Sequence, residues 1–149
     1  MVAAAKVPPV AARLGYAGLI PFVICSAMLW FVDQPLLEYM SDALLLYAAI
    51  ILSFMGAIHW GLGIANADAP SARLLVISVI PPLIAWFAAF LPTPVQLSVL
   101  YLTFAALCVF DSREARAGRA PSWYPRLRVP LTVVVVVSLI NAQLALSLA

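Results

Sequence analysis

The sequence predicts an all-α fold: an integral membrane bundle of five transmembrane helices, with the N-terminus cytoplasmic and the C-terminus outside. The composition is 66% hydrophobic and 9% charged, whereas ordinary soluble domains carry about 25% charged residues. The apolar residues fall into five long runs, and all eight Lys and Arg residues lie on one side if the runs alternate across a membrane. Basic residues concentrate on the cytoplasmic side of membrane proteins, which gives the orientation.

The five expected helices occupy residues 14–32, 43–65, 74–91, 95–110 and 129–149. At a rise of about 1.5 Å per residue, runs of this length cross or nearly cross a hydrocarbon core of about 30 Å. The last run is rich in valine, but these runs are too long and too uniformly apolar for barrel strands. The 149 residues leave room for one membrane domain and no soluble module.

The first run follows a short basic arm, a pattern shared with signal peptides. It is longer than a typical signal-peptide core, and no small-residue cleavage pattern follows it before Asp33. We therefore expect it to remain as a spanning helix.

The third run contains Pro81 and Pro82, which remove two backbone donors. We expect them to kink or locally unwind the helix, which a bundle tolerates where neighbours satisfy the freed carbonyls. Whether this kink lines a cavity stays open. The short turn Pro92-Thr93-Pro94 makes the third and fourth runs an antiparallel hairpin.

The run 43–65 is expected to be the central helix and contains the only histidine, His59. A histidine inside a bilayer is either a buried ligand or proton-handling group, or an interhelical hydrogen-bonding residue beside a close helix contact. Trp60 and Ser53 are the ligand or hydrogen-bond candidates next to it. Three glycines are the candidates for helix packing: Gly56, Gly61 and Gly63.

No metal, cofactor or catalytic residue is expected. Zinc requires four ligands, and only Cys108 is placed at a depth comparable with His59, whereas Cys25 is expected nearer the membrane centre. A hydrolase would need a hydroxyl such as that of Ser53 beside His59 and an acid, Asp68 or Asp111. The spacing does not favour that arrangement.

The acidic residues are expected in loops or at helix ends, which argues against proton-coupled transport because proton relays place carboxylates within the membrane. They are Asp33, Glu38, Asp42, Asp68, Asp111 and Glu114. Two amides, Asn141 and Gln143, lie inside the last run and point about 200° apart on a helix of about 100° per residue. We expect one of them to form a hydrogen bond within the bundle and the other to approach the outer interface.

The hydrophilic segment 111–128 is expected to be a cytoplasmic loop at the lipid interface. Its arginines suit an anionic leaflet and its aromatic residues suit the headgroup level, so we expect membrane lipids rather than nucleic acid as partners. Docking of another protein is the alternative. The interfacial candidates are Arg113, Arg116, Arg119, Trp123, Tyr124, Arg126 and Arg128.

Four stretches together resemble one family. They are LGYAGLIPFV (14–23), ALLLYAAIILSFMGAIHWGL (43–62), SVIPPLIAWFAAFLP (78–92) and PSWYPRLRVPLT (121–132). They are similar to the small bacterial and mitochondrial inner-membrane proteins grouped with transmembrane protein 69. The resemblance implies a compact five-helix protein in a family of unknown function and supplies no catalytic residues.

Two hypotheses follow for function. The first is a non-enzymatic accessory or assembly protein, which contacts a larger membrane complex, lipids or a second copy through the glycine-rich helix and the arginine loop. The second is a ligand-handling carrier or small membrane enzyme with a pocket around His59. The expected location is the bacterial cytoplasmic membrane, or an organellar inner membrane in a eukaryote.

Overall fold

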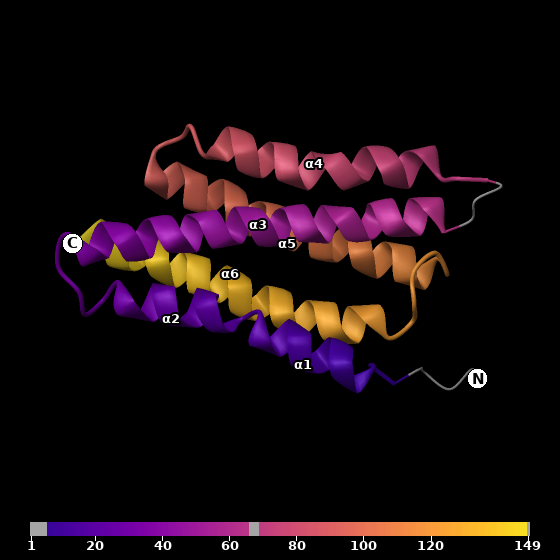
Figure 1. Ribbon diagram of the computed structural model, residues 1–149, viewed down its shortest axis with the longest axis horizontal. Coiled ribbons are helices and arrows are strands. Elements are labelled where there is room, and N and C mark those ends of the chain that lie inside the picture. The colour runs from indigo at the N-terminus through magenta and orange to yellow at the C-terminus, as the bar shows by residue number, and fades with distance from the viewer. Residues whose placement is uncertain (1–5, 66–68, 149) are drawn as a thin grey trace.

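The computed structural model describes residues 6–65 and 69–148, and these residues form helices and short connections without a strand (Figure 1). The helices are α1 (Pro9–Ala17), α2 (Ile20–Met28), α3 (Leu36–Ile64), α4 (Ala72–Ala88), α5 (Thr93–Arg116) and α6 (Tyr124–Leu148). Four stretches are long and apolar enough to cross a membrane: Pro9–Met28, α3, α5 and α6. α4 is a shorter apolar helix of 17 residues. The prediction of a helical membrane bundle is therefore confirmed.

The helix ends differ from the apolar runs, because three helices continue into polar sequence. α3 starts at Leu36 rather than at residue 43, and its first turn contains Glu38, a charge that favours a helix N-terminus. α5 continues to Arg116 and α6 starts at Tyr124. The expected loop 111–128 is thus reduced to the connection 117–123.

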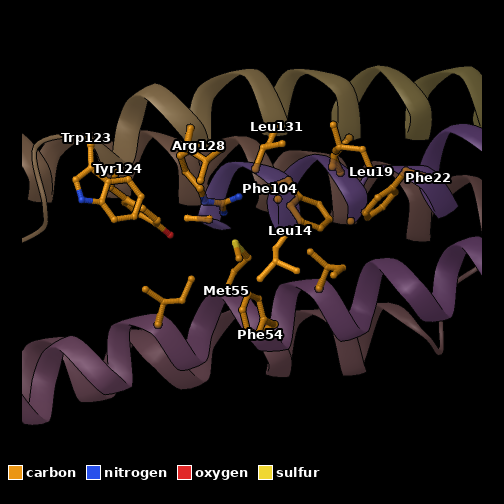
Figure 2. A pocket seen from close by; sticks show the side chains of 17 residues that line it. Leu14, Leu19, Phe22, Phe54, Met55, Phe104, Trp123, Tyr124, Arg128 and Leu131 are labelled. Atoms are coloured by element: carbon orange, nitrogen blue, oxygen red, sulfur yellow. The ribbon is translucent and has the colours of Figure 1, made fainter. Parts of the chain in front are cut away.

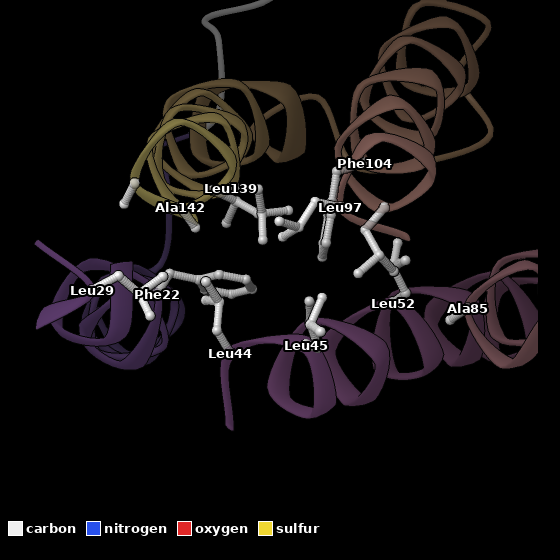
Figure 3. Packing of buried hydrophobic residues seen from close by; sticks show 14 of the residues in the cluster. Phe22, Leu29, Leu44, Leu45, Leu52, Ala85, Leu97, Phe104, Leu139 and Ala142 are labelled. Atoms are coloured by element: carbon white, nitrogen blue, oxygen red, sulfur yellow. The ribbon is translucent and has the colours of Figure 1, made fainter. Parts of the chain in front are cut away.

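Five helices pack as a closed ring. α2 packs against α3 and α6, α3 packs against α4, α4 against α5, and α5 against α6. The buried apolar side chains gather where the helices face one another (Figure 3). They include Phe22, Leu44, Leu52, Leu97, Leu100, Phe104 and Leu139. Large apolar side chains also cover the outside of every helix, as expected for surfaces that face lipid.

The expected first helix is divided into α1 and α2 at Gly18. Pro21, at the start of α2, has no N–H to donate to the preceding turn, which disfavours a continuous helix here. The hydroxyl of Tyr47 in α3 donates a 2.9 Å hydrogen bond to the Gly18 carbonyl and attaches the break to the ring. Beyond it, α1 contacts mainly α6. α1 therefore lies outside the ring.

α3 and α4 approach closely at one glycine. Pro82 lacks the N–H that would pair with the Ser78 carbonyl, and α4 continues through both prolines with that oxygen directed at Gly56 of α3. A Cβ at Gly56 would overlap the oxygen, and a Cβ at Gly63 would lie 3.1 Å from Leu75. Gly61 has no neighbour within 4 Å of its Cβ position. Two of the three predicted packing glycines thus face α4.

The two amides of α6 bind neighbouring helices. Asn141 donates to the Ser26 carbonyl of α2 at 3.0 Å and accepts from Trp30 Nε1 at 3.1 Å. Gln143 donates to the Pro94 carbonyl of α5 at 3.2 Å and to Ser98 Oγ at 3.1 Å. These hydrogen bonds link α6 to both of its neighbours in the ring.

Gly56→Ala is expected to lower stability by about 1–3 kcal/mol, because the added methyl group meets a backbone oxygen that moves only with α4. Gly61→Ala is the matched control and should be neutral or slightly stabilising. Thermal unfolding of both variants in the same detergent tests the difference. Equal midpoints for the two variants would contradict the close contact.

Candidate functional site

The first part of the site is a buried network of His59, Asp111 and Arg128, called the inner network here. His59 Nε2 of α3 lies 3.0 Å from Asp111 Oδ1 of α5, and Arg128 Nε of α6 donates to Asp111 Oδ2 at 2.7 Å. The three residues are 2%, 1% and 5% exposed. One carboxylate therefore connects three helices of the ring.

The three residues lie at the same level of the bundle. His59 and Asp111 each stand five residues before the end of their helices, and Arg128 stands four residues after the start of α6. At about 1.5 Å per residue, each is about 6–8 Å from that end. The N-terminus of α1 and the first turn of α4 are at this end as well (Figure 1).

The inner network contains polar atoms without hydrogen-bond partners among the described residues. The contact between His59 and Asp111 is within ion-pair distance but lacks the directed geometry of a hydrogen bond. His59 Nδ1 and Arg128 Nη2 have no partner, whereas Arg128 Nη1 donates to Thr132 Oγ1 at 3.5 Å. Buried polar atoms are nearly always paired, so these atoms without partners require an explanation.

One turn further along α5, Glu114 forms a second network with Arg73 and Arg119, called the outer network here. Glu114 is 1% exposed and accepts from Arg73 Nη1 at 3.0 Å and from Arg119 Nε at 2.6 Å. The two arginines are exposed. The hydrogen bond to Glu114 raises the pKa of Arg119, so its charge is secure.

Phe110 packs between the two networks. Its ring meets the His59 imidazole edge-on, with the two ring centroids 5.2 Å apart. The Arg73 guanidinium lies over the Phe110 ring, 5.2 Å from its centroid. Phe110 therefore lies between His59 of the inner network and Arg73 of α4.

A cavity of about 380 Å³ opens between α1, α3 and α6 (Figure 2). Its walls are almost entirely apolar, from Phe22 and Leu19 at one end to Met55 and Leu131 in the middle. The exceptions lie at the other end, where Trp123, Tyr124 and Arg128 line it. The cavity exists because α2 packs on α3 whereas α1 does not.

The other predicted ligand candidates in α3 lie away from His59. Ser53 is exposed, and its hydroxyl bonds back to the Ala49 carbonyl at 2.9 Å. Trp60 is half exposed on the outside of α3. Asp111 does reach His59, but the other acid considered for a hydrolase, Asp68, lies outside the described residues. Ser53, the hydroxyl considered for a hydrolase, therefore does not meet the imidazole.

The predicted interfacial residues divide into two groups. Arg113, Arg116, Arg119 and Arg126 are exposed, and Trp123 and Tyr124 are partly buried. Arg128 differs from the expectation: it is buried because Asp111 pairs with it inside the bundle.

Asp111 and Glu114 also differ from the expectation, because they lie within α5 and face the core rather than a loop. The sequence does contain a signal for this. The buried residues of α5 are Leu97, Leu100, Phe104, Leu107, Asp111 and Glu114. Their spacing alternates three and four residues, so the two acids continue the apolar face that a helix buries.

The site can hold charge and hydrogen-bond a ligand but offers no set of metal ligands. Among the described residues, no group of three or more His, Cys, Asp or Glu side chains is close enough to bind a metal ion. Cys25 and Cys108 are free thiols. What the geometry does provide is an apolar cavity whose lining includes the buried residue Arg128.

Comparisons with known proteins agree with the fold. The family model described as protein of unknown function (DUF3429) matches residues 7–144. Transmembrane protein 69 of Xenopus tropicalis is 34% identical over 137 residues, which cover 91% of this chain. The chain spans about half the length of this relative, 54%. No solved structure matches.

Removing one charged residue of the inner network is expected to lower the stability of the protein far more than removing two. Arg128→Met leaves the Asp111 charge unpaired and should cost about 3–5 kcal/mol, as should Asp111→Leu. The double variant Asp111→Leu/Arg128→Met should recover most of this loss, because it removes both buried charges. Unfolding of all three variants in detergent measures the coupling.

Arg126→Met, on the exposed side of α6, is the control for loss of an arginine in this segment. It should change stability by less than about 0.5 kcal/mol. Additive costs in the double variant would show that Asp111 and Arg128 do not depend on each other.

Proposed function

The chain belongs to the DUF3429 family, and on that premise we propose that it is an inner-membrane protein that binds an amphiphilic molecule. The apolar part of the ligand occupies the cavity between α1, α3 and α6, and its polar head lies beside Arg128. The observation that carries this proposal is the buried residue Arg128 in the lining of an apolar cavity, with a guanidinium Nη2 that has no hydrogen-bond partner among the described residues.

Small-molecule sites are typically concave and mainly apolar, with a few polar groups that set the orientation of the ligand. The cavity of about 380 Å³ has that character, since its polar groups gather at one end. The lining includes the exposed residues Leu14 of α1 and Phe54 of α3, so a molecule dissolved in the membrane can enter from the side of the bundle. The break at Gly18 lets α1 diverge without disturbing the ring.

The proposed topology has five crossings, with α4 as the short fifth span and the N-terminus in the cytoplasm or an organellar matrix. Lys6, Arg13 and the basic residues of α4, α5, α6 and the connection 117–123 belong to one end of the bundle. The opposite end contains Asp33 and Glu38. This asymmetry supports a basic cytoplasmic face in contact with anionic lipids.

An accessory role in a larger membrane complex is the second candidate. Arg113, Arg116 and Arg126 are exposed and form no ion pair with another described residue, so they are available to lipid headgroups or a protein partner. The glycine-rich face supports it less, because Gly56 and Gly63 face α4. Stoichiometric recovery of a complex after mild-detergent purification would favour this role.

Ala11→Trp is expected to remove the bound amphiphile, because Ala11 lines the cavity and an indole there fills its open side. Ala17→Trp is the matched control, since Ala17 ends the same helix on its exposed face and does not line the cavity. Mass spectrometry of the proteins purified from their native membrane would identify the bound molecules.

The wild type and Ala17→Trp should retain one common amphiphile that Ala11→Trp lacks, while all three proteins elute as the same species. Identical bound molecules in all three would contradict binding in this cavity.

A further inference from the structure

The end of the cavity at Arg128 is a site for hydrogen-bond acceptors. Two of the guanidinium nitrogens are used within the protein, by Asp111 and Thr132, whereas Nη2 has no partner. Tyr124 lines the same end of the cavity, one turn before Arg128 on α6 (Figure 2). A ligand head placed there meets a cationic group and the adjacent Tyr124 hydroxyl.

The charge balance of the inner network indicates what that head is. The network contains one carboxylate, on Asp111, and two groups able to be cations, His59 and Arg128. With a neutral imidazole the network is balanced. With a protonated imidazole it has one buried positive charge in excess, and the described residues around it provide no second carboxylate to balance it.

The neighbouring titratable and charged groups do not provide that balance. Glu114 on α5 is already shared by Arg73 of α4 and Arg119, so the outer network also has one carboxylate and two cations. α6 contributes Tyr124 beside Arg128, which is uncharged at neutral pH. With a neutral imidazole the inner network is balanced, whereas the outer network has one positive charge in excess.

Extending the proposed function, on which this inference rests, we infer that the ligand is a single-chain amphiphile with a monoanionic head, of the long-chain carboxylate type. The head pairs with Arg128 Nη2, and His59 takes up a proton on binding so that Asp111 keeps a full counter-charge. The bound state then contains two anions, Asp111 and the ligand head, and two cations, Arg128 and the protonated His59. A volume of about 380 Å³ is near the lower end of the range of about 300–1,000 Å³ for ligand pockets, which suits one chain.

An uncharged head would use the same donor without changing the charge balance. Its binding would then be independent of the protonation of His59. Anion binding without proton uptake would leave one net negative charge buried between the helices, which is costly in a low-dielectric site. The two kinds of head group are thus distinguishable by the pH dependence of binding.

The experiment uses a long-chain alkyl sulfonate brominated next to its head group, which stays anionic throughout the pH range, and the corresponding brominated alcohol. The full chain is placed in nanodiscs of uncharged lipid, and quenching of tryptophan fluorescence measures binding. Trp123 lines the head end of the cavity, so the part of the quenching that disappears in Trp123→Phe reports the site.

The sulfonate is expected to bind more tightly as the pH is lowered, by up to about tenfold per pH unit, because one proton is taken up with the anion. The alcohol should bind more weakly, with no pH dependence. In His59→Gln the sulfonate should bind weakly at every pH, because no proton can be taken up. The double variant Asp111→Leu/Arg128→Met, which is expected to recover most of the stability lost in either single variant, should lose the preference for the sulfonate.

Equal binding of the two probes, or sulfonate binding in the wild type that does not vary with pH, would overturn the anionic head and leave the proposed function standing. Displacement of the sulfonate by a two-chain phospholipid but not by a single-chain carboxylate would overturn the single-chain ligand. Absence of Trp123-specific quenching by either probe would overturn the proposed function as well.

Discussion

The attachment of Asp111 to two other helices is the constraint on which the rest of this bundle depends. A carboxylate that is 1% exposed near the end of an apolar helix is stable only with partners, and neither partner comes from α5 itself. His59 of α3 and Arg128 of α6 must therefore be at the same level as Asp111, which fixes the register of three helices. Apolar contacts alone specify such a register weakly, since one turn of aliphatic residues resembles the next.

The position of the cavity follows from the same arrangement. Arg128 is held in the wall by its bond to Asp111, so its guanidinium cannot extend to the aqueous surface as a long basic side chain near a helix end usually does. On the other side, Pro21 interrupts the helix and lets α1 leave the ring. The face of α6 that contains Arg128 thus lies opposite α1, and apolar residues of both helices line the space between them.

Hydropathy predicted the helices well and their polar ends poorly, for one physical reason. A window of sequence shows the cost of placing Asp111 or Glu114 within a bundle, but it does not show Arg128 and Arg73, which offset that cost from other helices. The alternation of three and four residues along α5 was present in the sequence and continued through both acids. By contrast, the freed Ser78 carbonyl opposite Gly56 depends on which two helices meet, and no local pattern contains that information.

The inner network is more than is needed to hold the helices together. Replacing a buried ion pair by apolar residues of similar size is often neutral or stabilising. Stability alone therefore does not require a carboxylate and an arginine in this position. The atoms that remain unpartnered, Arg128 Nη2 and His59 Nδ1, are also those that a purely structural pair would have satisfied. These unpartnered atoms, together with the cavity whose lining includes Arg128, are the reason why we propose ligand binding as well as cohesion for the buried charges.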